Sequence, residues 1–467
     1  LMMTWPMPAR LATHMLGEDF DVWNRPWNTW WTRQVLTEGG DFYFTDYVFY
    51  PQGSSLIYHS FSHTNTALSL LLEPFVGMVA GYNLPGLLAY ILSGFAMYLL
   101  VMELTGDWLA GLVAGLIYAF APYHVDQSSH PIAYTTQWIP LTLFFLIRML
   151  RRGRVLDAVL AAVFLALTAL SSWHLFLFMV LFITLFFGCR FICGWPEWDN
   201  NRWRSITIFG IVALVLIVPF LYPLVREQFV ATDPDYVRTS ASEGNVADLL
   251  LFIVPSRRHP LWGEWVRPIH HGIGTGSRQI FLGFGALILA AYGLVRRPKT
   301  AVFWALAAVV FFVLALGPYP TANGQRIGPL LPWGLPIASI VRDTQRFVIM
   351  VNLAIAVLAG LGVAALRERM VGRRRVLISG ALVVIVLVEF LSLPFPNLPV
   401  KIPDFYRQIA DDPDPDAIVD VPIGKLTLER LYMFYQTVHK KPIVEGIVGR
   451  KSSDAYAFID SNTLLTA

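Results

Sequence analysis

Two acidic residues near the start of the chain are the first candidates for chemistry. Asp21 and Asp46 lie in a segment that is rich in tryptophan and tyrosine, a composition typical of the interface between a membrane and water. A carboxylate at that interface is disfavoured unless it has a partner or a task. The tasks open to it are accepting a proton or holding a divalent cation. The alternative interpretation is that both are solvated loop carboxylates.

Basic side chains form the second group of candidates, because arginine and histidine can stabilise negative charge on a substrate. His130 follows His124 and Asp126 in a short polar stretch, where it could contact a substrate or cap a helix end. The arginines could equally contact lipid headgroups. The other candidate substrate-binding residues are Arg238, Arg257, Arg258, Arg267, His270, His271, Arg278, Arg342 and Arg346.

Membrane helices are the elements that must position these residues. The 467 residues are 55% hydrophobic and only 14% charged, which is more apolar surface than a soluble domain of this size can bury. We therefore expect an all-α polytopic membrane protein with about ten to eleven transmembrane helices, by a window of about 19 residues. The clear spans are 84–103, 108–122, 133–150, 155–171, 173–192, 206–224, 278–295, 300–317, 346–366 and 376–393.

Clusters of arginine predict how these spans are oriented. The clusters follow every second span, which by the positive-inside rule makes their side cytoplasmic. The apolar stretch 66–79 would invert this pattern if it crossed the membrane. It is short and carries Glu73, so we interpret it as a juxtamembrane or re-entrant helix at the outer interface. The outer segments are then 1–83, 123–132, 225–277, 318–345 and all residues after 394.

The charge and cysteine content exclude other classes of function. The net charge of +3 comes from basic residues bunched at the ends of spans, which is not the footprint of a nucleic-acid-binding protein. Cys189 and Cys193 are the two cysteines, and the sequence near them lacks further metal ligands. We expect them to be free thiols on the reducing side. Membrane lipid, and no nucleic acid, is the expected partner.

The chain divides into two predicted domains. Residues 1–393 form the transmembrane domain, whose external first loop covers 17–83. Residues 394–467 contain prolines, an acidic turn and short β-rich runs, which predict a small external α/β domain that is cut short. A first loop of this length also predicts a membrane span before residue 1.

Short motifs spread over most of the chain resemble those of the bacterial YfhO-like membrane proteins. They are 17–21, 27–31, 45–53, 118–123, 137–140, 281–283, 342–347 and 435–439, together with His59 and His130. These proteins are similar to the GT-C superfamily of integral membrane glycosyltransferases, which take a sugar from a polyprenyl-phosphate carrier and use an acidic residue in the first external loop. The resemblance implies a GT-C-like fold, makes Asp21 that acidic residue and adds His59 to the substrate-binding candidates.

The resemblance implies a glycosyltransferase on the outer face of the cytoplasmic membrane, with a polyprenyl-phosphate-linked sugar as donor. Asp21 would be the general base that takes the proton of the attacking acceptor. Asp46 would orient the acceptor or bind a divalent cation together with Asp21. No other cofactor is implied, and the metal ligands are left open. The outer arginines would stabilise the phosphate that departs.

Two alternative functions stay open from the sequence. A GT-C-like scaffold without catalysis could serve as an accessory subunit of a membrane protein complex, because a fold does not guarantee activity. A transporter is the weaker alternative, since the predicted spans lack the buried charges and the inverted repeat of ion-coupled carriers. Asp21, Asp46 and the outer arginines favour the enzyme.

Overall fold

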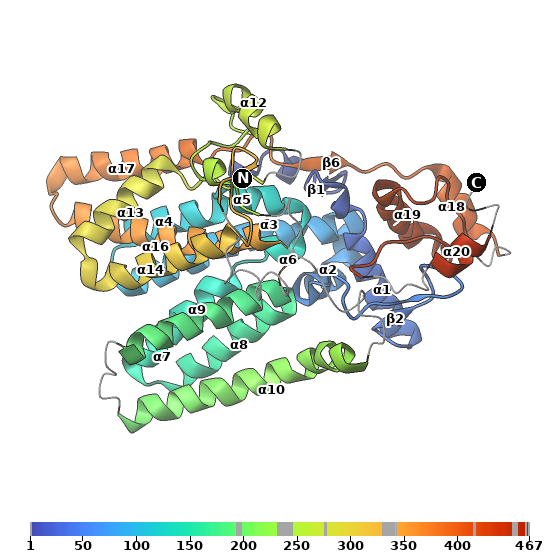
Figure 1. Ribbon diagram of the computed structural model, residues 1–467, viewed down its shortest axis with the longest axis horizontal. Helices are drawn as coiled ribbons and strands as arrows, with labels where there is room; N and C mark the ends of the chain where they lie inside the picture. The colour runs from blue at the N-terminus through green and yellow to red at the C-terminus, as the bar shows by residue number, and fades with distance from the viewer. Residues whose placement is uncertain are drawn as a thin grey trace.

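The computed structural model describes residues 2–192, 199–230, 246–274, 278–328, 341, 343–413, 417–450, 456–462 and 465. Three residues named above, Cys193, Arg238 and Arg342, lie outside the described residues. The described fold is mainly helical, with two groups of long helices and a region of shorter elements at one end (Figure 1).

Six helices of the described residues are long and apolar enough to cross a membrane. Four are single helices: α3 (Met78–Thr105), α9 (Trp173–Ile192), α10 (Asn200–Val230) and α14 (Pro298–Ala315). The others are composite. Trp108–Ser129 joins α4 (Trp108–Phe120), α5 (Pro122–Asp126) and η4 (Gln127–Ser129), and Thr344–Arg367 joins η6 (Thr344–Phe347) and α16 (Val348–Arg367).

The prediction of ten to eleven spans is therefore too high by length and composition within the described residues. Three predicted spans form helices of fewer than 18 residues, namely α7 (Trp138–Arg152), α8 (Val155–Ser171) and α13 (Phe284–Arg296). α17 (Gly372–Glu389) has the length, but it begins with three consecutive arginines. Hydropathy averaged over a window reports apolar content and not helix length, so it counted these segments as spans. The predicted spans 133–150 and 278–295 include residues before α7 and α13, whereas 155–171 coincides with α8.

The first helix group is built around α16, which packs against α4, α13 and α14. Its residues are almost all buried, because it is covered on every side by other helices. The contact with α13 is close: a Cβ atom on Gly293 would lie 2.7 Å from the backbone nitrogen of Gly362. Glycine at both positions permits this approach of the two backbones. The result is a rigid centre for the group.

The second group contains α7, α8, α9 and α10, with α10 along its edge (Figure 1). α3 connects the two groups, because it contacts α4 in the first and α7 in the second. α2 (His63–Val76) packs beside α3 and ends at Gly77, whose φ of 79° lets the chain turn before α3 begins. With 14 residues α2 is too short to span a bilayer. Its Glu73 forms an ion pair with Arg33 at 2.5 Å.

The region of shorter elements brings the N-terminal segment into contact with the C-terminal segment. Strand β1 (His14–Leu16) pairs antiparallel with β6 (Asn397–Pro399). The residues before the first loop contain η1 (Met2–Thr4) and η2 (Met7–Ala9). The first loop itself contains η3 (Phe20–Val22), α1 (Arg25–Glu38) and the hairpin of β2 (Phe44–Thr45) and β3 (Ser54–Ser55). Along the chain, η5 (Leu249–Phe252) and α12 (Gly263–Ile273) lie between α10 and α13, and β4 (Thr321–Ala322) and β5 (Gln325–Arg326) lie between α14 and α16. The C-terminal segment adds α18 (Asp404–Asp411), α19 (Leu426–His439) and α20 (Ala457–Ser461).

The C-terminal segment packs onto the first loop. The indole nitrogen of Trp27 donates to the side-chain carbonyl of Gln436 at 2.7 Å, and the Gln436 amide donates to the carbonyl of Tyr47. In its described residues this segment has helices and a single bridge, Ile418 to Ile443, and its one strand, β6, pairs with β1. The predicted α/β domain is thus mainly helical here, and its place outside the membrane stays a prediction.

Candidate functional site

Asp21 is held in position by the turn that precedes α6 (Pro131–Tyr134). The hydroxyl of Ser129 accepts hydrogen bonds from the backbone N–H groups of Glu18, at 3.1 Å, and Asp19, at 3.0 Å. Gly17 has a φ of 111°, and a Cβ atom there would lie 2.7 Å from the Cα atom of Ser129. Glycine is therefore required where the first loop crosses this turn. Asp19 then caps η3 by accepting the backbone N–H of Asp21 at 3.4 Å.

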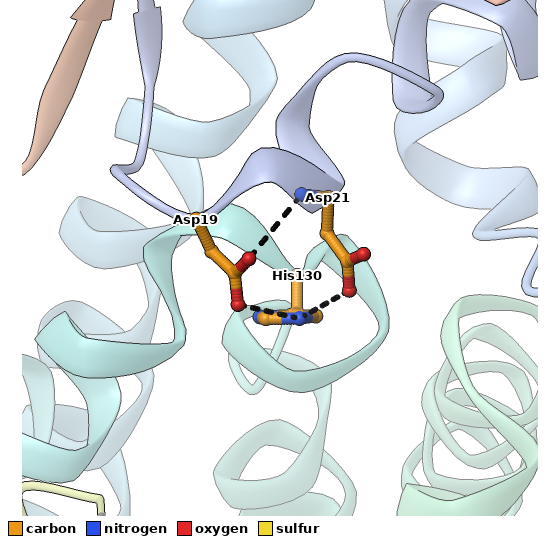
Figure 2. Close-up of side chains that lie close together, drawn as sticks. All are labelled: Asp19, Asp21 and His130. Atoms are coloured by element: carbon orange, nitrogen blue, oxygen red, sulfur yellow. Dashed lines mark hydrogen bonds and ion pairs between the residues drawn. The ribbon is translucent and has the colours of Figure 1, made fainter. Parts of the chain in front are cut away.

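His130 and two carboxylates converge at this crossing (Figure 2). The Nε2 atom of His130 donates to the Oδ2 atom of Asp21 at 2.8 Å and lies 3.9 Å from the Oδ2 atom of Asp19. The His130 side chain is 5% exposed, that of Asp21 is 20% exposed and that of Asp19 is 45% exposed. The cluster is thus closed on the His130 side and open to solvent on the Asp19 side.

Two arginines contact the same carboxylate. The Nε atom of Arg430, from α19, lies 2.6 Å from the Oδ1 atom of Asp21, and Arg25, from α1, approaches the Oδ2 atom at 3.7 Å. Burial raises the pKa of Asp21, but the hydrogen bond from His130 and the charges of Arg25 and Arg430 outweigh it and hold that pKa below its usual range. Burial lowers the pKa of His130, although Asp21 opposes this. The pair is therefore a carboxylate beside a neutral imidazole.

A second charged cluster lies beside the first. Asp126 forms ion pairs with Arg258 at 3.1 Å and Arg278 at 3.7 Å, and Arg258 also pairs with Glu18. Burial lowers the pKa of Arg278, but the negative charges around it, led by that of Asp126, raise it overall. Asp19 is among these charges, so Arg278 couples the two clusters electrostatically. Two of the predicted phosphate-binding arginines are thus engaged by carboxylates.

The remaining predicted site residues are dispersed. Asp46 is exposed after β2, and the carboxylate beside Asp21 is that of Asp19. Arg267 is exposed and pairs with Glu264 on α12, where His271 is also exposed. The other positions follow. The Nε2 atom of His270 donates to the carbonyl of Pro255, Arg257 donates its backbone N–H to Gln279, and Arg346 pairs with Asp343 at 3.0 Å.

One protein family matches most of this chain. The family described as "Domain of unknown function (DUF6311)" covers residues 37–389. The chain belongs to this family. The match does not name the YfhO-like proteins, so that part of the resemblance stays a prediction. No curated protein matches the chain.

Solved structures show which fold this DUF6311 protein shares. The oligosaccharyltransferase of Archaeoglobus fulgidus in its apo form has a TM-score of 0.58 and 12% identity, over 96% of this chain and 62% of its own. The same enzyme with an inhibitory peptide and a dolichol-phosphate gives 0.55 and 13%, with the same coverage. ArnT from Cupriavidus metallidurans, in the apo state, gives 0.47 and 13%, over 93% of this chain and 82% of its own. The chain spans less than two thirds of the oligosaccharyltransferase, and the fold is GT-C-like.

Four residues of the DUF6311 site were missed as candidates from the sequence. Asp19 stands two positions before Asp21, a spacing that places two carboxylates near one another and that could have been used. Asp126 was noted beside His130 without a role. Arg25 is four positions after Asp21, which on a helical turn is also a usable signal. Arg430 had no such signal, because a partner so distant in sequence becomes visible only in the fold.

His59 has a structural role in the packing of the first loop. Its ring is buried, its Nε2 atom lies 2.8 Å from the side-chain carbonyl of Asn28, and it meets the edge of Trp27 at 5.9 Å between ring centroids. Burial, helped by the charge of Arg25, lowers the pKa of His59 to about 3. The imidazole is therefore neutral at physiological pH and available for packing.

This pKa predicts a dependence of stability on pH. Between pH 6.5, the ordinary pKa of histidine, and about 3, the unfolded chain takes up a proton on His59 that the folded chain excludes. The free energy of unfolding therefore falls as the pH falls through this window. We expect the unfolding midpoint to drop between about pH 7.5 and 5, and to drop less in His59→Gln, which can still donate to Asn28. Equal drops in both proteins would assign the effect to other groups.

Proposed function

We propose that this DUF6311 protein is a membrane glycosyltransferase that moves a sugar from a polyprenyl-phosphate carrier to an acceptor on the outer face of the cytoplasmic membrane. The six apolar helices of the described residues and the GT-C-like fold support a place within a membrane. The observation that carries the proposal is the convergence of Asp21, Asp19 and His130 beside partly buried arginines. The structural neighbour bound to dolichol-phosphate is an oligosaccharyltransferase, which supports the class of donor.

Asp21 is the proposed centre of the reaction. Its carboxylate is ionised and half enclosed, so it can accept a hydrogen bond from an attacking hydroxyl or amide and orient that group. The low pKa makes Asp21 a weak acceptor for a complete proton transfer. Orientation and stabilisation of positive charge that develops on the sugar are therefore favoured over the full general-base role expected from the sequence. Asp46, as an exposed residue, would act on the acceptor only from the rim.

Arg278 and Arg346 are the proposed contacts for the phosphate that leaves. Both are partly buried, both already face carboxylates, and Asp126 and Asp343 fix their direction. A phosphate entering this cluster would replace carboxylate contacts with stronger bidentate ones. Arg258 is the third candidate. Because it already pairs with two carboxylates, Glu18 and Asp126, a phosphate would have to displace more contacts there.

A divalent cation fits the residues of the first cluster. Asp19, Asp21 and His130 each offer one ligand atom, and these atoms lie within 4.8 Å of one another. One imidazole nitrogen with two carboxylate oxygens is a donor set suited to Zn²⁺ or Mn²⁺, and the exposed side of Asp19 leaves room for water or substrate. The cation would supply a positive charge that polarises a bound oxygen.

We expect a chelator to lower the transfer activity at least 10-fold, with recovery on addition of Mn²⁺ or Zn²⁺. In Asp19→Asn the same recovery should need a higher metal concentration, because one ligand charge is lost. The measurement is the activity of the chelated protein against added metal. Full activity in the presence of the chelator would remove the cation from the proposal.

The proposed function is tested by release of polyprenyl phosphate. The full-length protein in lipid would be supplied with a panel of polyprenyl-phosphate-linked sugars and acceptors, and the freed carrier would be measured. Release by the wild-type protein, lost in Asp21→Asn, supports the transferase and the site together. Release that persists in the variant would move the reaction away from Asp21.

One observation favours the second candidate function, a GT-C-like scaffold in a membrane protein complex. Arg430 contacts one oxygen of Asp21 at 2.6 Å, which leaves that oxygen less available to a substrate. Absence of release with every donor, both in the wild-type protein and in Arg430→Ala, would favour the scaffold. Release that appears or rises in Arg430→Ala would instead support the enzyme with Arg430 as a competitor for Asp21.

A further inference from the structure

A large cavity lies far from Asp21, where the second helix group ends. Its volume is about 850 Å³, and residues of α7, α9, α10 and α14 line it. α7 begins eight residues after His130, and its residues from Leu143 to Arg151 border the cavity. Arg151 lies 13 residues after the start of α7, which at 1.5 Å per residue is roughly 20 Å along the helix.

The cavity wall is mainly apolar. Leucine, isoleucine, valine and aromatic side chains make up most of its lining, for example Leu146, Ile147 and Phe303. A volume of this size lies within the range of pockets that hold small molecules, roughly 300–1,000 Å³. In a membrane protein such a space can take up a hydrocarbon chain.

Four basic residues stand at the same cavity: Arg151, Arg190, Arg202 and Lys299. Two of them are partly neutralised, because Arg151 pairs with Glu103 at 3.3 Å and Arg202 pairs with Asp199 at 4.0 Å. Among the described residues, Arg190 and Lys299 form no ion pair with a carboxylate, and both are exposed. Positive charge thus remains at one part of an apolar cavity.

We propose that this cavity binds an anionic glycerophospholipid, with its phosphate against Arg190 and Lys299 and an acyl chain between α7, α9 and α14. The positive charges of Arg190 and Lys299 complement an anionic headgroup, and the apolar space beside them is large enough for an acyl chain. Basic pockets between membrane helices are known to hold anionic lipid headgroups. The positive-inside rule alone would place arginines at these helix ends, but it would not require a cavity between them.

The test is lipid binding to the purified full-length protein, measured by native mass spectrometry during titration with phosphatidylglycerol or phosphatidylcholine. We expect phosphatidylglycerol to bind at least 10-fold more tightly than phosphatidylcholine. The double variant Arg190→Ala with Lys299→Ala should lose about 10-fold or more of that affinity. The matched control is Arg373→Ala with Arg374→Ala, which removes two exposed arginines from the start of α17, outside the cavity.

A second variant tests the apolar part of the cavity without changing its basic residues. Ile147→Trp fills the apolar part of the cavity and should weaken phosphatidylglycerol binding while all four basic residues remain. Equal affinity for the two lipids, or equal losses in the cavity variant and the α17 control, would overturn the proposal. Tighter binding of a polyprenyl phosphate than of phosphatidylglycerol, lost in the Arg190 and Lys299 variant, would also overturn it, because the cavity would then hold the carrier.

Discussion

Replacement of Asp21 by asparagine is expected to lower the release of polyprenyl phosphate by about 10²- to 10⁴-fold. The substitution keeps the shape of the side chain but removes the charge that Arg25, Arg430 and His130 all contact. An asparagine cannot attract a metal ion or the positive charge that develops on the sugar to the same degree. The measurement is the initial rate of carrier release under conditions in which the wild-type protein turns over.

The matched control for this prediction is Asp46→Asn. Asp46 lies in the same first loop but is exposed, so we expect its loss to change the rate less than threefold. Because Asp21→Asn leaves two arginines without their partner, a second variant combines it with Arg430→Gln to restore the charge balance. We expect the double variant to regain stability but not activity. Recovery of activity in it, or equal loss in Asp46→Asn, would contradict the assignment.

Trp27→Ala is expected to lower the free energy of unfolding by about 3–5 kcal/mol. The indole is fully buried, stacks on Trp31 with centroids 5.8 Å apart, and donates to Gln436 of the C-terminal segment. Its loss leaves a cavity and an unpartnered amide oxygen at the junction of the first loop and α19. The measurement is the thermal midpoint by circular dichroism in detergent.

A matched tryptophan offers the control for this change. Trp265 on α12 is 81% exposed, and Trp265→Ala should shift the free energy of unfolding by no more than about 0.5 kcal/mol. Similar midpoints for the two variants would mean that the junction contributes little to stability. A lower thermal midpoint for Trp27→Ala, in a variant whose helix content before heating equals that of the wild-type protein, would support the packing of Trp27 at this junction.

Asp21 and His130 could each be proposed from the sequence because each stands in a recognisable local context. Asp21 was singled out as a carboxylate in an aromatic, interfacial loop, and His130 as a polar residue after an apolar stretch. The structure brings these two side chains within 2.8 Å of each other. Their contact depends on the crossing at Gly17, and neither composition nor periodicity describes a crossing of two loops.

The parts that depend on distant contacts could not be predicted. Asp46 was grouped with Asp21 because the two lie in one loop, but the fold turns Asp46 outward and brings Asp19 inward. The sequence predicts that Arg258 binds a phosphate, whereas in the structure it is paired with Glu18 and Asp126. The charge of a side chain indicates whether it can bind an ion. Only the fold shows whether it is already paired with an opposite charge from another part of the chain.

The helical character of the fold followed from hydrophobicity, but the division into spans did not. A hydropathy window reports apolar length and ignores where a helix begins or ends. α13 has only 13 residues as a helix, yet the predicted span 278–295 includes a coil before it. The sequence of α16, by contrast, is apolar on every face of the helix, as expected for a helix that is buried on all sides.

The hydrogen bond between Trp27 and Gln436 joins residues that are 409 positions apart. A ribosome adding about 5–20 residues per second needs roughly 20–80 s to cover that interval. During this time the first loop has already emerged, while Arg430 and the glutamine that will close the junction do not yet exist. Asp21 therefore remains without its α19 partner during this whole interval, and the site can be completed only after α19 has been synthesised.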